Sequence, residues 1–299
     1  MKKIKLNDIV EYLNSCDVEF QIEGKKDIII EGFSSISNYK DKTMTWLRDE
    51  KSVDDSIREK AILLCIVQEG VEIGACTKII SKEPRAIFFS LINHFWNDMD
   101  EERQPIGQGT VIGRHVQIGN NVQIGNNCSI SGEITVGDNT VIGDNVVIRN
   151  RVNIGHDCHI QSMVVIGEDG YGYIEDENHK KEMIKHHGGV SIGNEVFIGS
   201  HVNIARGVID DTIIEDGVKI APSSHIGHNG HIEKNASIIC SKLFGSVKVA
   251  ENAYIASSVI RNQTTIGQNT LIGMGSVVTK DIDSNKIAYG NPAKVIKDI

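Results

Sequence analysis

The chain has 299 residues, enough for two domains that each bury a core. Its formal net charge is -9 and its lysines and arginines are scattered, which argues against nonspecific binding to nucleic acid or to an anionic membrane. Aromatic residues make up only 5% of the chain whereas glycines number 29, a composition that suits thin aliphatic layers with tight corners.

The beginning of the chain and its cysteines predict a soluble, cytoplasmic protein. The first residues, Met1 to Lys3, lead into a polar segment and not into an apolar run, so we expect no secretory signal. The longest apolar run, residues 61–67, is far shorter than the ~20 residues needed to span a bilayer. The six cysteines form no CxxC pair, and we expect them to be small buried side chains in a reducing compartment.

Residues 1–103 predict a small α/β domain. Ile9, Val10 and Leu13 are spaced for one face of a helix, which Asn7 is expected to cap. Strand-like runs follow at residues 18–22, 27–31, 43–47, 61–67 and 77–80. Pro84 is expected to begin a second helix with an apolar face. The acidic, polar segment 98–104 is predicted to link this domain to the rest of the chain, residues 104–299.

From Ile106 to Ile166 an aliphatic residue stands at every sixth position. Many of these residues are followed by Gly and then by Asn or Asp, as in Ile118-Gly119-Asn120. A period of six belongs neither to an ordinary strand nor to a helix. It predicts that each six residues form one short strand and one corner, so that three such units complete one coil of a prism. We therefore predict a mainly β fold, a parallel β-helix.

The period of six is interrupted once, at residues 168–189, by a segment rich in His and Lys. A solenoid accepts an insertion only at a corner, and long loops of this kind are usually functional. The period resumes at Ile192, with five-residue steps around Ile209 and Ile214. The last residues, 289–296, leave the repeat and are predicted to close the open end of the solenoid.

Hexapeptide coils of this type look like those of the left-handed β-helix acyltransferases. Three segments occur in order: 166–173 (IGEDGYGY), 205–214 (ARGVIDDTII) and 225–229 (HIGHN). Together they resemble the family of UDP-3-O-acylglucosamine N-acyltransferases, which N-acylate a nucleotide-linked amino sugar for lipid A. Segments 32–36, 46–47 and 79–85 are similar to the nucleotide-binding domain of that family. The resemblance covers nearly the whole chain and implies a homotrimer with active sites between neighbouring prisms.

Amide formation from a thioester requires a proton acceptor for the amine, a donor for the oxyanion, and placement of both substrates. His228 matches the family's catalytic base, and an imidazole with a pKa of ~6.5 suits that task. A simple corner histidine is the alternative. Gly245 matches the position whose backbone N–H faces the oxyanion, although a corner glycine with positive φ is equally consistent.

The chain departs from the family at two positions near the base. The aspartate that orients the base in the lipid A enzymes corresponds to Ala221, which leaves Ser223, Ser224 or a backbone carbonyl as candidate acceptors. A second histidine of the family corresponds to Gln263. These departures predict that the acceptor sugar or the acyl donor differs from the lipid A case.

Substrate contacts are predicted at several further positions. Trp46 replaces the family's base-stacking phenylalanine, and a core tryptophan is the competing interpretation. We expect the inserted loop to recognise the sugar through Asp169, Tyr171 and Tyr173, and the 225–229 motif to add His225 to the substrate-binding residues.

The C-terminal segment is predicted to bind the acyl donor. Asn291 and Lys294 resemble the closing segment of CoA-dependent sugar acetyltransferases, where this segment lies near the nucleotide of the cofactor. A solvated Lys294 is the alternative. We expect no metal, because His156 and His159 do not converge on a strand and corner and no Cys or carboxylate set completes a site.

The sequence therefore favours an acyl-CoA-dependent N-acyltransferase of a dTDP- or UDP-linked amino-deoxysugar for surface glycans, with acetyl or a short hydroxyacyl such as 3-hydroxybutyryl as the acyl group. The chain stops at Ile299 without a long C-terminal helix, which favours CoA over acyl carrier protein. The alternative is the lipid A enzyme itself, which uses a hydroxyacyl-acyl carrier protein. A noncatalytic, trimeric scaffold that binds a nucleotide sugar is an alternative of another class.

Overall fold

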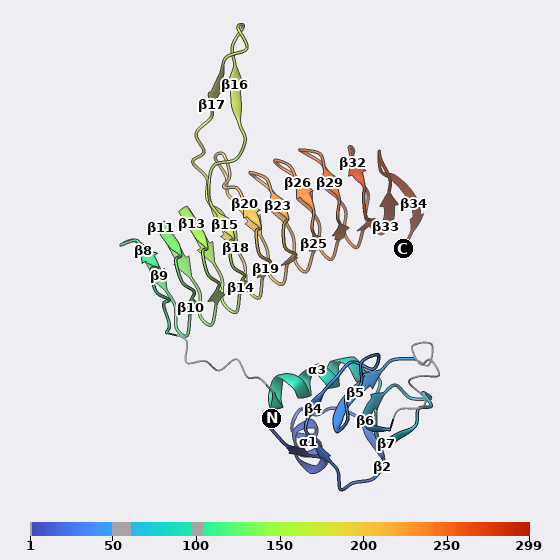
Figure 1. Ribbon diagram of the computed structural model, residues 1–299. Coiled ribbons are helices and arrows are strands. Elements are labelled where there is room, and N and C mark those ends of the chain that lie inside the picture. Colours follow the sequence, from blue (N-terminus) through green and yellow to red (C-terminus); the bar gives the residue numbers. More distant parts are fainter. Residues whose placement is uncertain (1, 50–60, 97–103) are drawn as a thin grey trace. The chain divides into compact units, whose positions relative to one another are not determined.

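The computed structural model describes residues 2–49, 61–96 and 104–299. The chain divides into two compact units, residues 1–102 and 103–299 (Figure 1). Of the predicted linker, residues 98–103 lie outside the described part of the chain. No helix among the described residues has both the length and the apolar character to cross a membrane.

The N-terminal unit contains two helices and two sheets among its described residues. The helices are α1 (Leu6–Ser15) and α3 (Pro84–Phe95). The larger sheet has the order β2-β7-β6-β5-β4 and consists of β2 (Gln21–Gly24), β4 (Gly32–Phe33), β5 (Thr43–Leu47), β6 (Ile62–Val67) and β7 (Ala75–Ile80). Only β2 is antiparallel to its neighbour. The smaller sheet pairs β1 (Ile4–Lys5) with β3 (Ile29–Ile30).

Helices α1 and α3 form where the apolar spacing predicts them. Ile9 and Leu13 of α1 and Leu91 of α3 are fully buried in the same core. The predicted cap of α1 is wrong: Asn7 lies inside the helix, and Lys5 is the N-cap. The Lys5 backbone N–H donates to the Asp8 carboxylate at 3.0 Å. This bond gives the N-cap N–H a partner from the first turn of the helix, so no cap by Asn7 is needed.

Residues 104–299 form a β-solenoid with three faces, which confirms the predicted fold. Strands of the first face are β8 (Val111–Ile112), β15 (Val165–Ile166), β20 (Asn203–Ile204), β23 (His225–Ile226), β26 (Lys242–Leu243), β29 (Val259–Ile260) and β32 (Val277–Val278). Strands of the second face are β9 (Val116–Ile118), β18 (Val190–Ile192), β21 (Thr212–Ile214), β24 (His231–Ile232), β27 (Lys248–Val249) and β30 (Thr265–Ile266). The long strands β11 (Ser129–Val136) and β13 (Val147–Ile154) run from the first face to the second.

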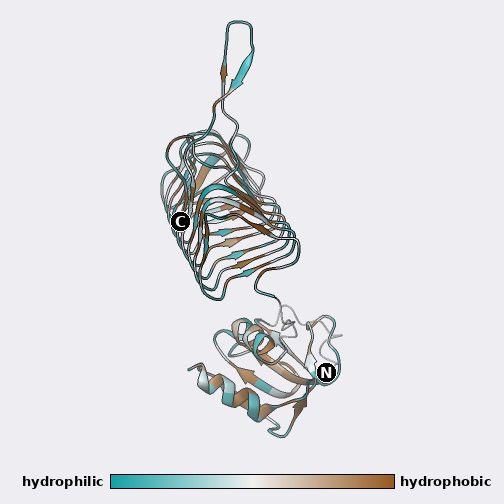
Figure 2. Ribbon diagram, turned by 90° about the vertical axis from the view of Figure 1, so that its left-hand side faces the viewer, coloured by the Kyte–Doolittle hydropathy of each residue, from teal (hydrophilic) through white to brown (hydrophobic). Residues whose placement is uncertain are grey.

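The third face is one continuous sheet. Its strands are β10 (Gln123–Ile124), β12 (Val141–Ile142), β14 (His159–Ile160), β19 (Phe197–Ile198), β22 (Lys219–Ile220), β25 (Ser237–Ile239), β28 (Tyr254–Ala256), β31 (Leu271–Ile272), β33 (Lys286–Tyr289) and β34 (Lys294–Asp298). All of them pair in parallel except β34, which folds back on β33 and ends the stack. In Figure 2, which looks along the solenoid, the coils superimpose into one prism.

The period of six fills the interior of the prism. Residues 18 apart are neighbours in the parallel ladders, so that Ile130 lies beside Ile148 and Ile148 beside Ile166, all fully buried. Stacked aliphatic side chains of this kind are stabilised by the hydrophobic effect and require no long-range pairing. Ile106, in the first coil, is 45% exposed because that coil has a solenoid neighbour on one side only.

The Gly-Asn and Gly-Asp pairs have a structural cause at the corners. Asn121 and Asn139 both adopt the left-handed conformation, which asparagine tolerates, and their side chains are hydrogen-bonded at 3.2 Å. The Asp138 carboxylate accepts the Asn120 N–H of the preceding coil at 2.7 Å. It lies where a side chain on Gly119 would be, 2.3 Å from the position of a Cβ. We call corners with this arrangement regular corners.

The insertion leaves the solenoid at a corner, as the sequence predicts. It connects β15 of the first face with β18 of the second and contains the antiparallel pair β16 (Tyr173–Glu175) and β17 (Lys181–Met183). In both ribbon views this hairpin projects away from the prism (Figures 1 and 2).

The cysteines follow the prediction only in part. Cys65, Cys128 and Cys158 are buried, but Cys16 and Cys240 are exposed. Cys16 directly follows α1, and Cys240 directly follows β25. Both therefore stand where the chain leaves an element, and neither points into a core.

Candidate active site

Corners that connect the first face to the second stack into a single column, which we call the site column. The parallel register aligns Val116, Ile134, Val152, Val190 and Thr212 as the residues that follow these corners. The corners themselves comprise residues 113–115, 131–133, 149–151, 167–189, 205–211, 227–230, 244–247 and 261–264. All three segments that carry the family resemblance thus reach the same edge of the prism, although 166 and 229 are far apart in the sequence.

His228 is half-buried in this column, directly after β23, and its Nδ1 lies 3.1 Å from Oδ1 of Asn229. The Asn229 amide is itself fixed: Oδ1 accepts the Val208 N–H at 3.0 Å and Nδ2 donates to the Asp210 carbonyl at 3.1 Å. Because an oxygen faces Nδ1, that nitrogen carries the imidazole proton, and Nε2 is left as the acceptor. Nε2 of His228 is therefore the ring nitrogen with a free lone pair.

The acceptor that orients His228 is none of the candidates from the sequence. Ser224 donates its hydroxyl hydrogen to the Ala221 carbonyl at 2.9 Å, and Ser223 is exposed. Asn229 performs the task from the next position in the chain. The signal in the sequence was the asparagine itself, which we interpreted only as part of the motif.

Gly245 packs directly against the His228 ring. A Cβ on Gly245 would lie 2.5 Å from Nε2 and 2.6 Å from Cε1 of His228, so any side chain there displaces the imidazole. The φ angle of Gly245 is not positive, and the alternative of a positive-φ corner glycine is therefore wrong. Among the described residues none accepts a hydrogen bond from the Gly245 N–H, so a backbone donor remains available beside Nε2.

The inserted loop, residues 168–189, also reaches His228. A Cβ on Gly170 would lie 3.1 Å from Cδ2 of His228 and 3.2 Å from Nε2 of His186. The His186 and His228 rings are perpendicular, with their centroids 5.4 Å apart. His186 was not among the predicted site residues, because one histidine of a His- and Lys-rich loop carries no pattern that distinguishes it.

Asp169 holds the ends of this loop together. Its carboxylate lies 3.9 Å from Nη1 of Arg206 and accepts the His186 backbone N–H at 3.4 Å. Arg206 in turn donates from Nε to the Gly188 carbonyl at 2.6 Å. Asp169 therefore has an anchoring role, and sugar recognition by this side chain remains a prediction.

Both predicted tyrosines lie on the outside of the loop. Tyr171 is 79% exposed and Tyr173 is 41% exposed, with their ring centroids 4.8 Å apart. Tyr171 follows Gly170 directly, so the pair begins one residue from the contact with His228. Their contact with a sugar remains a prediction.

His225 lies on the outer side of β23, between Asn203 of β20 and Lys242 of β26. Burial lowers the pKa of His225 below its ordinary value, and the positive charge of Lys242 lowers it further. The neutral form of His225 is therefore favoured three residues before His228.

Three predicted site residues lie elsewhere. Trp46 is half-buried on β5 of the N-terminal unit, where it packs against the core and its ring centroid is 6.5 Å from that of Phe88. This contact is the one that a core tryptophan would make, and base stacking remains a prediction. Asn291 and Lys294 are exposed at the C-terminal end of the solenoid, around the start of β34.

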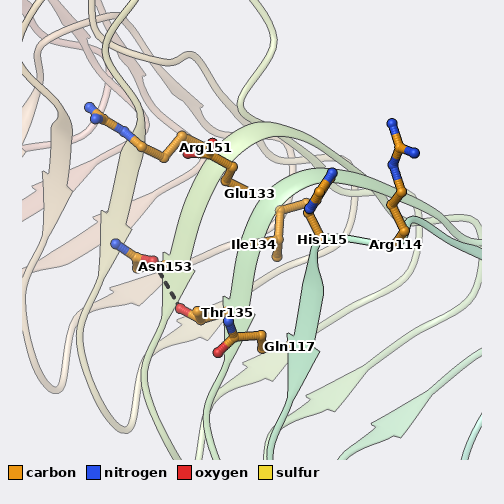
Figure 3. Close-up of a pocket in the computed structure, with 8 residues that line it drawn as sticks. All are labelled: Arg114, His115, Gln117, Glu133, Ile134, Thr135, Arg151 and Asn153. Atoms are coloured by element: carbon orange, nitrogen blue, oxygen red, sulfur yellow. Dashed lines mark hydrogen bonds between the residues drawn. The ribbon is translucent and has the colours of Figure 1, made fainter.

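A hollow in the site column lies toward the N-terminal end of the solenoid (Figure 3). It has a volume of about 450 Å³ and is lined by Arg114, His115, Gln117, Glu133, Ile134, Thr135, Arg151 and Asn153. Thr135 donates to Asn153 at 2.9 Å, and Arg151 pairs with Asp211 at 2.5 Å. This hollow is open and polar, and His228 is not part of it.

Known proteins that are similar to this chain have the same kind of repeat and fold. Two family models match: bacterial transferase hexapeptide (six repeats) over residues 133–168, and GMPPB C-terminal domain over residues 208–297. The chain is similar to LpxA of Acinetobacter baumannii, with a TM-score of 0.58 and 25% identity over 65% of this chain and 74% of that one. A UDP-N-acetylglucosamine acyltransferase of Campylobacter jejuni has the same TM-score at 23% identity, over 64% and 73% of the two chains.

Sequence relatives cover a smaller part. A UDP-3-O-acylglucosamine N-acyltransferase of Delftia acidovorans is 34% identical over 131 residues, which is 43% of this chain and 39% of the relative. One of Campylobacter lari is 32% identical over 136 residues, 45% of this chain and 43% of the relative. The match thus spans about two-fifths of the length of these relatives. In its repeat, its fold and its relatives the chain is thus similar to the hexapeptide-repeat transferases, and its solenoid has the fold of a left-handed β-helix.

Proposed function

We propose that this chain is an N-acyltransferase that moves an acyl group from a thioester to the amine of a nucleotide-linked amino sugar. The observation that carries the proposal is the arrangement at His228. Its Nδ1 is held by Asn229, its Nε2 is free to accept a proton, and Gly245, whose N–H is unused among the described residues, packs against the same ring. A base beside an oxyanion donor is what attack of an amine on a thioester requires.

In this reaction the amine nitrogen attacks the thioester carbon while Nε2 of His228 accepts an amine proton. The Gly245 N–H donates to the oxygen of the tetrahedral intermediate. Collapse of the intermediate breaks the carbon–sulfur bond, and the departing thiolate receives the proton from His228. The products are an amide and a free thiol, and the imidazole returns to its neutral form.

Comparisons favour one acceptor over the other. The relatives are named for UDP-3-O-acylglucosamine, and this supports the lipid A-type substrate over the dTDP- or UDP-linked amino-deoxysugar that the sequence departures favour. Ala221 and Gln263 remain the observations in support of the amino-deoxysugar. We propose UDP-3-O-acylglucosamine as the acceptor to test first, with a hydroxyacyl-acyl carrier protein as donor and acyl-CoA as the alternative.

Further parts of the proposal follow from the family resemblance. A homotrimer would bring two prisms together at each site column, and the N-terminal unit would bind the nucleotide, with Trp46 against the base. Tyr171, Tyr173 and His225 would contact the sugar or the acyl group. Asn291 and Lys294 would bind the phosphates of a CoA donor. We place the protein in the cytoplasm, where these donors are made.

The test is a thiol-release assay with the purified full-length chain. Each donor, acyl-CoA or acyl carrier protein, is combined with UDP-3-O-acylglucosamine and with a panel of dTDP- and UDP-amino sugars. We expect release with one pair and a loss of about 100- to 10,000-fold in kcat/KM for His228→Ala. The matched control is His156→Ala, since His156 is an exposed histidine of a regular corner whose side chain pairs with the neighbouring Asp157.

Outcomes of this assay separate the alternatives. Release only with acyl-CoA and a dTDP-amino sugar would overturn the lipid A-type substrate but keep the reaction. Release that His228→Ala leaves unchanged would overturn the choice of base. No release with any pair would favour a noncatalytic nucleotide-sugar-binding protein.

A further inference from the structure

His186 is a buried histidine that the proposed reaction does not use. Its side chain has no exposed surface, although it comes from the inserted loop, most of which is exposed. His187, the next residue, is exposed. The fold therefore places one of two adjacent histidines of a polar loop inside the protein, at the edge that carries His228.

Hydrogen bonding fixes which nitrogen of His186 carries the proton. Nδ1 lies 2.8 Å from the Ile184 carbonyl, which can only accept, so Nδ1 donates and Nε2 has a lone pair. Among the described residues nothing donates to this Nε2, and it is shielded from solvent. Buried acceptors in native proteins are nearly always satisfied, so an unsatisfied one asks for an explanation.

The unsatisfied lone pair lies beside the base. Nε2 of His186 and Cδ2 of His228 both come within 3.2 Å of the position that a Cβ on Gly170 would occupy. The rings are perpendicular, which places the edge of one imidazole against the face of the other. Glycine at position 170 is what allows this approach, because a larger residue would enter the space between the two rings.

The lone pair on Nε2 of His186 would attract His228 electrostatically once His228 is protonated. When Nε2 of His228 accepts the amine proton, the ring becomes a cation and its C–H edge becomes more positive. A lone pair that no hydrogen bond neutralises is a fixed partial negative charge, and its effect is larger in a buried environment than in water. The Asn229 side chain is neutral, and the carboxylate that the family would place at Ala221 is absent.

We propose that His186 is a positioning residue whose buried, unpaired Nε2 stabilises the imidazolium form of His228 during the transfer. His186 acts through His228 and touches no substrate. The proposal rests on the proposed function, since it assigns a task to His186 in the same reaction. The bond from Nδ1 to the Ile184 carbonyl gives one ring nitrogen a task in the fold, whereas nothing in the described part of the fold uses Nε2, and we assign that nitrogen to the reaction.

The test removes the nitrogen and keeps a ring. His186→Phe should lower kcat about 10-fold with KM for the amino sugar unchanged, because the loss appears only when His228 is charged. Its melting temperature should stay within a few degrees of the wild-type value, because the loss of the hydrogen bond from Nδ1 to the Ile184 carbonyl is offset by the removal of an unsatisfied acceptor. His186→Gln, which offers an amide oxygen near the same place, should recover part of the lost kcat. His187→Phe is the matched control and should leave both quantities unchanged.

Each result decides the proposal. A wild-type kcat in His186→Phe, with the wild type itself active, would overturn the role of His186 and leave the proposed function intact. A His186→Phe variant that is slow and also melts many degrees below the wild type would mean that His186 is structural. That result would also overturn the proposed role. A wild type inactive with every substrate pair would overturn the proposed function and this role with it.

Discussion

Regular corners and the site column use the same residue types for different purposes. At a regular corner, Gly119 is required because the Asp138 carboxylate and backbone of the next coil occupy the place of its side chain. In the site column, Gly245 is required because the His228 imidazole occupies that place. A glycine in one column thus reports on folding and in the other on function. The local sequence does not separate the two cases, but the register of the coils does.

The largest expected effect comes from replacing the glycine of each kind of corner with alanine. Gly245→Ala should lower kcat/KM about 100-fold, because the new methyl group displaces the His228 ring and misplacing a catalytic group by about 1 Å costs this much. The melting temperature should change little, since an imidazole side chain can swing aside. Gly119→Ala should do the opposite and destabilise the fold by about 1–3 kcal/mol, because the methyl group meets the backbone of Asp138 at 2.8 Å.

Activity assays and thermal unfolding of the two variants check this prediction. Activity per folded molecule should be normal in Gly119→Ala. If Gly245→Ala kept full activity, the contact with His228 would have no role in catalysis. If it lost both activity and stability like a regular corner, Gly245 would be a structural glycine.

A second pair of variants compares asparagines. Asn229→Ala removes the acceptor for Nδ1 of His228, so that both tautomers form and kcat should fall about 10-fold. Asn145→Ala at a regular corner is the matched control, since Asn145 has the same left-handed backbone and no contact with His228. Asn145→Ala should lose about 1 kcal/mol of stability because alanine is strained in this conformation, and Asn229→Ala should lose more because it also gives up the hydrogen bonds to Val208 and Asp210.

Imidazole nitrogen chemical shifts give an independent measurement for this pair. The His228 signals should show a single tautomer in the wild type and in Asn145→Ala, and a mixture in Asn229→Ala. An unchanged His228 spectrum in Asn229→Ala would exclude the asparagine as the orienting group, whatever happens to activity.

Much of the fold could be predicted from the sequence because the repeat is local. Each six-residue unit specifies its own strand and corner, and Ile130, Ile148 and Ile166 stack without information from distant residues. The insertion could be located because it interrupts the period. Strand bounds in the N-terminal unit were less accurate: β5 lies where predicted, but β3 comprises only Ile29–Ile30, because pairing with β1 and not apolar content sets its length.

The site could be predicted only where a motif carried it. His228 and Gly245 came from the family resemblance, and the structure brings them into contact. Asn229 was missed because its role depends on Val208 and Asp210, which lie one coil away and in a part of the chain with five-residue steps. His186 was missed because the return path of the inserted loop has no period that would show which histidine turns inward.

The lowered pKa of His225, on the outer side of β23, predicts that stability depends on pH, with a smaller effect than those of the glycine and asparagine variants. The pKa of His225 is lowered by burial, so the folded state resists protonation more than the unfolded state, whose histidine titrates near 6.5. As pH falls through 6.5, the unfolded state therefore binds a proton first and the fold loses stability, until His225 is also protonated in the folded state. Thermal unfolding should show that His225→Gln gains a few degrees over the wild type at pH 5 relative to the difference at pH 8. An equal difference at both pH values would contradict this assignment.

The smallest effect concerns thiols and sharpens the comparison without altering activity. Cys158 ends a regular corner, and its Sγ–H donates to the Gly193 carbonyl at 3.1 Å. Burial raises the pKa of the Cys158 thiol. In the N-terminal unit, burial raises the pKa of Cys65 to about 12. Cys240 stands at a left-handed corner position and is exposed, as is Cys16. Because the thiolate is the reactive form, N-ethylmaleimide at neutral pH should modify Cys16 and Cys240 first, and peptide mass spectrometry can count the sites. All six thiols should react in urea, which is the control. Equal labelling of Cys158 and Cys240 in the native protein would mean that regular corners open as readily as irregular ones, and the distinction on which the glycine and asparagine pairs depend would then fail.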